Sequence, residues 1–282
     1  MNARRKRAKF GLPVDVHGMQ RTYVLYVPTG YDAAKGAHLV IALHGGGSQG
    51  GAMRALSKFD ALAEQENFIV VYPDALLRNW NDDRSSEKLR SDADDVAFIS
   101  ALIDHLAKTY TIQKVFATGI SNGGFMTFRL ACELADKISA FAAVAATMPA
   151  DSQQTCQPGR AVPMLVMNGT DDRVVPYEGG QVMGGRGDIL STEATVAFWA
   201  ANNGCSGNPV ETLLPDLNPR DQTRVYVRTY PNGSAPVVLY RIENGGHTWP
   251  GGAQYLPVRM IGRVSRGINA TQVIWDFFKA QV

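Results

Sequence analysis

The stretch of residues 114–134 constrains the fold most strongly, because a short run of β-forming apolar residues passes directly into an amphipathic helix. The motif Gly-Ile-Ser-Asn-Gly stands at the junction, at positions 119–123. A strand that turns this sharply into a helix strains its central residue, and the flanking glycines tolerate the crowding because they have no Cβ. The pattern predicts a nucleophile elbow that exposes Ser121, although an ordinary tight turn also fits five residues alone.

Apolar runs on both sides of the elbow indicate a parallel sheet. Runs of this kind, uninterrupted by polar residues, are typical of strands covered on both faces. The order of strand, Gly-rich loop, helix and strand is that of an α/β protein with a mostly parallel central sheet flanked by helices. The runs span residues 39–43, 68–74, 138–146 and 162–168, and two later runs at 225–230 and 237–242 form a hairpin-like pair.

Length and charge limit the domain organisation and the partners. A chain of 282 residues with 45% hydrophobic content fits one large α/β domain. We expect residues 1–20 to form a flexible basic tail and residues 21–282 to form that domain. The net charge is only +2, so no nucleic-acid partner is expected.

The sequence pattern predicts neither a membrane-spanning helix nor a signal peptide. No stretch approaches the roughly 18 apolar residues of a membrane-spanning helix. The basic cluster near the start is followed by a broken run at residues 10–15, which does not fit the apolar part of a signal peptide. The sequence carries no indication of oligomeric state.

The chain has three cysteines, Cys132, Cys156 and Cys205. Their spacing contains no C-x-x-C pattern and no neighbouring histidine pattern, so no metal site is expected. Cys132 falls in the helix after the elbow, where we expect a buried apolar residue. Cys156 and Cys205 lie in polar, loop-like surroundings, and the sequence is compatible either with a disulfide between them or with two free thiols.

A serine nucleophile needs a base, and elimination among the five histidines favours one of them. His247 follows a predicted strand and stands between glycines and a Trp-Pro-Gly stop, so a loop at the carboxyl edge of the sheet can hold it. The others lie before the first predicted strands (His17, His38), in the Gly-rich loop (His44) or inside a helix (His105).

The acid that orients the base should follow a strand between Ser121 and His247, since α/β hydrolases order their triad Ser, Asp, His along the chain. Asp171 and Asp172 both meet this condition. We favour Asp172 as the acid, with Asp171 as a residue that caps or supports the turn. A carboxylate in this place holds the imidazole in the tautomer that accepts the serine proton.

The Gly-rich loop that begins at His44 offers backbone amides near the elbow. Removing one oxyanion donor typically costs about 3 kcal/mol in the transition state, so a loop devoted to this purpose is physically reasonable. We assign the amides of Gly46 and Asn122 as the pair of donors, with Gly47 as an alternative.

A different chemistry also fits the same loop. The pattern Gly45-x-Gly47-x-x-Gly50, with Asp74 beyond it, has the outline of a dinucleotide-binding fingerprint of an oxidoreductase. That hypothesis leaves Ser121, Asp172 and His247 without a joint explanation. A third hypothesis, a binding protein with a hydrolase fold and no catalysis, leaves the complete triad without a purpose.

Two further motifs carry a family resemblance: Gly-Thr-Asp-Asp-Arg-Val-Val-Pro-Tyr at 169–177 and Gly-Gly-His-Thr-Trp-Pro-Gly-Gly at 245–252. Together with the elbow, they make the chain resemble the polyhydroxybutyrate depolymerase and feruloyl esterase family of α/β-hydrolase serine esterases, from about residue 20 to the end. The resemblance implies Ser121, Asp172 and His247 as the catalytic triad and Gly46 with Asn122 as the oxyanion hole.

The resemblance also implies a reaction and a setting. The family hydrolyses carboxylic esters without a cofactor, on plant aryl esters or aliphatic polyesters, and many members are secreted, which favours a secreted or periplasmic location. Trp249, Trp80 and Tyr177 are candidates to line the substrate pocket, although amphipathic rings also pack in ordinary cores. The acyl and alcohol specificity is expected to depend on the loops at 76–91, 149–160 and 177–190.

Overall fold

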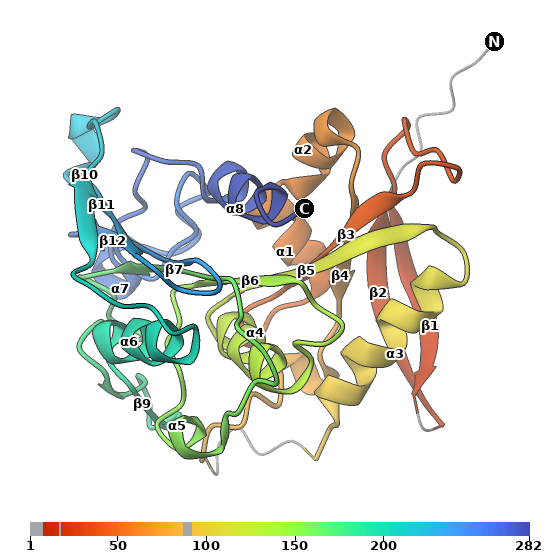
Figure 1. Ribbon diagram of the computed structural model, residues 1–282, viewed down its shortest axis with the longest axis horizontal. Helices are drawn as coiled ribbons and strands as arrows, with labels where there is room; N and C mark the ends of the chain where they lie inside the picture. Colours follow the sequence, from red (N-terminus) through yellow and green to blue (C-terminus); the bar gives the residue numbers. More distant parts are fainter. Residues whose placement is uncertain (1–7, 17, 87–91) are drawn as a thin grey trace.

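The computed structural model describes residues 8–16, 18–86 and 92–282, whose main feature is a ten-stranded sheet with helices on both faces (Figure 1). The middle strands, from β4 to β12 in the order below, run parallel, and the strands at both edges pair antiparallel. Across the sheet the order is β1 (Lys9–Val16), β2 (Met19–Tyr26), β4 (Ile69–Pro73), β3 (Ala37–Leu43), β5 (Ile112–Ile120), β6 (Ala140–Val144), β7 (Met164–Gly169), β12 (Val237–Glu243), β11 (Arg224–Tyr230) and β10 (Val210–Leu213).

Helices cover the sheet in two layers, seen above and below it in Figure 1. One layer contains α1 (Gly50–Ser57), α2 (Phe59–Glu66) and α8 (Ala270–Lys279), and the other contains α3 (Asp95–Ala107), α4 (Asn122–Glu133) and α6 (Thr192–Asn202). Smaller elements are α5 (Ser152–Thr155), α7 (Val258–Ile261), the 3₁₀ turns η1 (Leu76–Arg78) and η3 (Pro219–Asp221), and a separate two-stranded sheet of β8 (Gly180–Gln181) and β9 (Asp188–Ile189).

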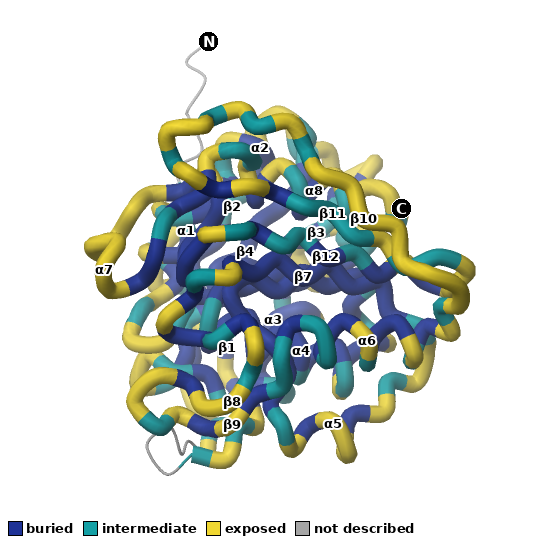
Figure 2. Tube along the Cα trace, turned by 90° about the vertical axis from the view of Figure 1, so that its left-hand side faces the viewer, coloured by how far each residue is buried: buried dark blue, intermediate teal, exposed yellow. Residues whose placement is uncertain are grey.

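Strand β3 shows why the apolar runs form a doubly covered sheet. Its side chains alternate between the two faces, and all of them from Leu39 to Leu43 are fully buried. Leu39 and Ile41 belong to the core that includes Phe98 of α3, whereas Val40 belongs to the core that includes Phe278 of α8. The predicted α/β-hydrolase architecture, with its central parallel strands, is therefore confirmed. Figure 2 shows the buried centre of the sheet and the more exposed segments around it.

Polar side chains cap the starts of three helices. Asp94 accepts a hydrogen bond from the Ala97 amide at the start of α3, and Ser191 accepts one from Ala194 at the start of α6. Asn269 accepts from the first turn of α8 in the same way. None of the helices in the described part of the chain is long and apolar enough to cross a membrane.

The boundary of the predicted N-terminal tail is wrong. Strand β1 begins at Lys9 and pairs antiparallel with β2, so residues 9–16 are part of the sheet. Val14 and Val16 alternate inward and are buried, a pattern that the preceding glycine and proline obscure in the sequence. The remaining basic cluster, at residues 4–7, lies outside the described residues.

The cysteine pairing also differs from the expectation. Cys132 of α4 is bonded to Cys156, which directly follows α5, and Cys205 is the free cysteine. The Cα atoms of the bonded pair are 5.1 Å apart, within the range that a disulfide spans. A sequence pattern could not show this pairing, because α5 comes to lie beside α4 only in the folded chain. The disulfide therefore ties the elbow helix to the segment at 149–160.

This pairing predicts both a thiol count and a loss of stability. Denatured, unreduced protein should react with one equivalent of a thiol reagent per chain, at Cys205. Cys156→Ser should lower the free energy of unfolding by about 3 kcal/mol, the usual effect of opening a loop of this size. Cys205→Ser is the control and should change stability far less. Peptide mapping that finds Cys156 joined to Cys205 would contradict the assignment.

Candidate active site

The predicted elbow forms at the junction of β5 and α4, with Ser121 at φ 57° and ψ −124°. A positive φ is rare for a residue with a side chain and indicates local strain of about 1–3 kcal/mol. The tight turn requires glycine on both sides, because a Cβ on Gly119 would lie 2.3 Å from the Gly123 carbonyl oxygen, and a Cβ on Gly123 would lie 2.4 Å from the Leu43 oxygen. The elbow therefore places Ser121 at the carboxyl end of the central strands.

His247 and Asp172 form a buried pair at the same edge of the sheet. His247 Nδ1 lies 2.8 Å from Asp172 Oδ2, and both side chains are almost completely buried. The other oxygen of Asp172 accepts hydrogen bonds from the amides of Val174 and Val175, each at 2.8 Å. These amides fix the carboxylate, so the shared hydrogen bond sets the imidazole orientation and leaves Nε2 available as a base.

One cavity of about 530 Å³ brings Ser121 and His247 together. Both side chains line it, and its surface is more apolar than polar. The structure shows no hydrogen bond between them, which is common for a serine and its base when no substrate is held between them. The arrangement has the parts needed for nucleophilic attack on an acyl carbon, with the proton passing to the imidazole.

The Gly-rich loop also borders the cavity. The amides of Gly46 and Asn122 have no hydrogen-bond acceptor among the described residues, and both residues line the cavity. His44 fixes the loop from below, since its Nε2 accepts from the Ala75 amide and its Nδ1 lies 2.8 Å from the Gly45 oxygen. Burial lowers the pKa of His44, which favours this neutral, structural form. The two amides can receive the oxygen of a tetrahedral intermediate.

The Asn122 side chain connects the elbow to a buried charged pair. Its amide nitrogen donates to Asp82 Oδ2 at 2.6 Å and to the Trp80 carbonyl at 3.0 Å, and its oxygen accepts from the Trp80 amide. Asp82 is also paired with Arg84 at 2.7 Å. Arg84 lies over the ring of Phe125, 4.0 Å from its centre. This network holds the first residue of α4 in place, and with it the amide that faces the cavity.

The three aromatic residues expected in the pocket are structural, which corrects that prediction. None of them lines the cavity that contains Ser121. Trp80 is 1% exposed and donates from Nε1 to the His44 carbonyl, so it supports the Gly-rich loop from behind. Tyr177 is 6% exposed and donates to Glu193. Their burial results from contacts with segments distant in the sequence.

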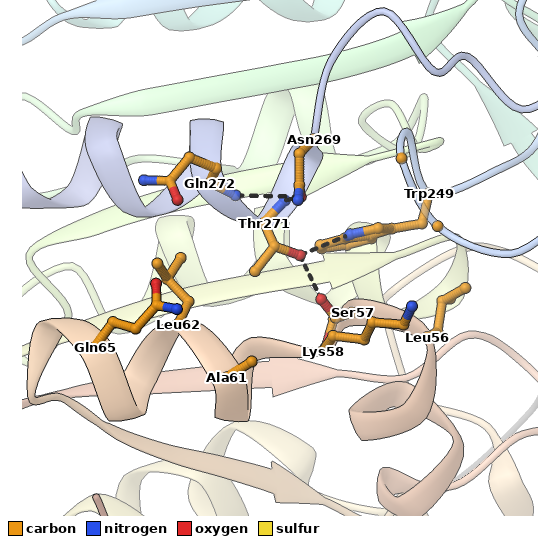
Figure 3. A pocket seen from close by; sticks show the side chains of 12 residues that line it. Leu56, Ser57, Lys58, Ala61, Leu62, Gln65, Trp249, Asn269, Thr271 and Gln272 are labelled. Carbon is orange, nitrogen blue, oxygen red and sulfur yellow. Dashed lines mark hydrogen bonds between the residues drawn. The ribbon is translucent and has the colours of Figure 1, made fainter.

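Trp249 belongs to a separate, smaller pocket (Figure 3). This pocket of about 220 Å³ lies between α1, α2 and the start of α8. Trp249 Nε1 donates to Thr271 Oγ1, which in turn donates to the Ser57 carbonyl. The indole therefore anchors the loop that carries His247 to the helices on that face, instead of contacting the space above Ser121.

Sequence reasoning missed most of the apolar wall of the cavity. The segment at 255–260 contributes Tyr255, Leu256 and Met260, and the turn between β8 and β9 contributes Met183. These side chains are 41–50% exposed. The sequence signal for this wall was a cluster of large apolar residues beside a proline. The cluster follows neither the helix nor the strand periodicity. Of the three loops expected to set specificity, 76–91 and 177–190 contribute lining residues, while the described lining includes none from 149–160.

Asp74 is occupied structurally, which weakens the dinucleotide hypothesis. One of its oxygens accepts from the Gly50 amide at 2.8 Å and the other from the Thr22 hydroxyl at 2.7 Å. In a dinucleotide site this carboxylate would bind a ribose hydroxyl. Gly50 itself is required by packing, since a Cβ there would lie 2.2 Å from the Tyr72 oxygen.

Comparison with known proteins agrees with this geometry. No protein-family model matches the chain. It is 28% identical over 278 residues to NocK of Nocardia uniformis subsp. tsuyamanensis, which is named as an inferred esterase, covering 94% of this chain and 80% of that protein. It is 29% identical to feruloyl esterase B of Piromyces equi, covering 80% of this chain but only 42% of that protein. It is 27% identical to feruloyl esterase C of Emericella nidulans, covering 80% and 76%.

Solved structures share the fold. The acetyl xylan esterase from Aspergillus awamori aligns with a TM-score of 0.58 at 17% identity, covering 81% of this chain and 89% of that one. Est1E from Butyrivibrio proteoclasticus aligns with a TM-score of 0.54 at 14% identity, covering 97% and 99%. The chain has the α/β-hydrolase fold, and the relatives that it resembles in sequence are named as esterases.

The buried Asp172–His247 pair predicts that the neighbouring carboxylates Asp172 and Asp171 differ in their importance for catalysis. Asp172→Asn should lower kcat for an activated ester by roughly 10³–10⁴-fold, because the amide no longer holds the imidazole in the useful tautomer. Asp171→Asn is the matched control, since Asp171 is partly exposed and lies 3.6 Å from Arg173. Steady-state kinetics of both variants would decide, and a larger loss in Asp171→Asn would contradict the assignment.

Proposed function

We propose that this protein is a serine carboxylic ester hydrolase that acts through an acyl-enzyme, and that its catalytic domain includes the chain from Lys9 onward. The observation that carries the proposal is the Asp172–His247 hydrogen bond beside a cavity that also holds Ser121. In the proposed mechanism, Nε2 of His247 takes the Ser121 proton as Oγ attacks the ester carbon. The amides of Gly46 and Asn122 stabilise the resulting oxyanion, and its collapse releases the alcohol, which takes the proton from His247.

The second half of the reaction uses the same groups. His247 takes a proton from water, the hydroxide attacks the acyl carbon, and the carboxylic acid leaves as Ser121 regains its proton. No step needs a metal or a redox cofactor. Strain at Ser121 and the fixed Asp172 carboxylate mean that little rearrangement is needed before attack.

The proposed substrates are esters of the feruloyl or acetyl type. Two of the relatives above are named feruloyl esterases, and a structural neighbour is named an acetyl xylan esterase. The predominantly apolar surface of the cavity suits an aryl or short acyl group. A short hydroxyalkanoate ester would fit the same chemistry, and a panel of feruloyl, acetyl and hydroxybutyrate esters would rank the three.

The proposal is tested by the reactivity of one side chain. Ser121→Ala should reduce hydrolysis of p-nitrophenyl acetate by at least roughly 10³-fold while the thermal unfolding curve keeps its shape. An alkyl fluorophosphonate should label the natural protein and fail to label this variant. Ser206→Ala, at an exposed serine far along the chain, is the control. Full activity in Ser121→Ala would refute the mechanism.

A further inference from the structure

The turn between β8 and β9 places a second arginine at the wall of the cavity. Arg186 lines the same space as Ser121. The turn is fixed at both sides, because the Met183 amide donates to the Val174 carbonyl at 2.9 Å and Arg84 Nη1 donates to the Arg186 carbonyl at 3.1 Å. The backbone that presents Arg186 is therefore held by the loop of the candidate acid and by the buried pair below Asn122.

The charge of Arg186 is not balanced within the described part of the chain. No described carboxylate lies within 4.0 Å of its guanidinium, and no described side chain forms an ion pair with it. The nearest acid along the turn, Asp188, does not line the cavity. Arg84 contrasts with it, since its charge is compensated by Asp82 at 2.7 Å and its side chain is 3% exposed.

Among the described residues, the cavity lining contains no group that would compete for this charge. None of the described residues that line the cavity is acidic. Asp172 is turned away, toward His247 and the amides of Val174 and Val175. The lining also includes exposed apolar side chains, among them Met183 and Met260. Arg186 is exposed, and no described carboxylate neutralises it, so its guanidinium is open to a carboxylate or phosphate that enters the cavity.

We propose that Arg186 is a specificity-determining residue that favours esters carrying an anionic group, a carboxylate or a phosphate, next to the apolar part of the substrate. This inference rests on the proposed esterase function and names a substrate class within it. The guanidinium binds the anionic group at the cavity wall while the ester carbon lies at Ser121. The competing interpretation, a solvated surface arginine, predicts no dependence of the rate on substrate charge.

Pairs of esters in which a free carboxylate is compared with its methyl ester test the proposal. One pair carries the charge on the acid: mono-p-nitrophenyl adipate and its methyl ester. The other carries it on the alcohol: para-carboxyphenyl acetate and its methyl ester. The quantity compared is the ratio of kcat/KM for the charged member to kcat/KM for the neutral member, in the natural protein and in variants. The pair that responds shows on which side of the ester bond Arg186 acts.

Arg186→Gln should lower this ratio about fivefold at most for at least one pair and leave the neutral member unchanged, as expected for one exposed ion pair. Arg186→Lys should restore part of the ratio. The matched control is Arg259→Gln, because Arg259 is exposed beside Met260 but does not line the cavity. In about 1 M salt, where the screening length is about 3 Å, the preference of the natural protein should shrink.

Failure of this inference can be told apart from failure of the esterase proposal. Equal ratios in the natural protein and Arg186→Gln, with both hydrolysing the neutral esters, would overturn the role of Arg186 and leave the esterase intact. If no ester is hydrolysed, calorimetry on Ser121→Ala with monophenyl adipate and its methyl ester decides the matter. If adding Arg186→Gln to Ser121→Ala weakens the binding of monophenyl adipate but not of its methyl ester, the inference is supported. Unchanged binding of monophenyl adipate would overturn it.

Discussion

The close contact between the elbow and the end of β3 is the constraint on which the site depends. Helix α4 can begin directly after β5 only because Gly119 and Gly123 have no Cβ. A Cβ on either residue would lie within about 2.5 Å of neighbouring backbone atoms. This contact strains Ser121 into a positive φ and sets the Asn122 amide beside the Gly-rich loop. The nucleophile and the oxyanion donors thus arise from one local packing arrangement.

Hydrogen bonds to three other segments of the chain hold the rest of the site in place. The Trp80 side chain supports the Gly-rich loop, and Asn122 is bonded to Asp82. Trp249 anchors the His247 loop through Thr271. Buried polar groups of this kind are costly unless every partner is present, so together they favour a single arrangement of the cavity. The disulfide from Cys132 stabilises the far end of the same helix.

Sequence alone predicted the elements whose signals are local. The glycines of the elbow and the apolar runs of the sheet act within a few residues, and the elbow and the central strands form as expected. Asp172 and His247 could be predicted because α/β hydrolases order their triad Ser, Asp, His along the chain and because parallel strands end at one edge of the sheet. The structure brings these residues to one site, while their catalytic roles stay a proposal.

The errors concern features decided by distant contacts. Whether Trp80 or Trp249 faces substrate depends on which loop covers it, and in both cases a buried hydrogen bond to another segment decides. The partner of Cys156 depends on where α5 docks. The apolar rim and Arg186 were missed because the 255–260 segment and the β8–β9 turn meet only through the fold.

The central claim is that an acyl group passes through Ser121, and a direct observation of that intermediate tests it best. Protein quenched in acid during turnover of p-nitrophenyl acetate would be digested and analysed by mass spectrometry. The account predicts an acetyl group on Ser121, which disappears when substrate is exhausted. An acetyl group on another residue that forms and decays at the rate of turnover, or turnover with Ser121 unmodified throughout, would contradict it.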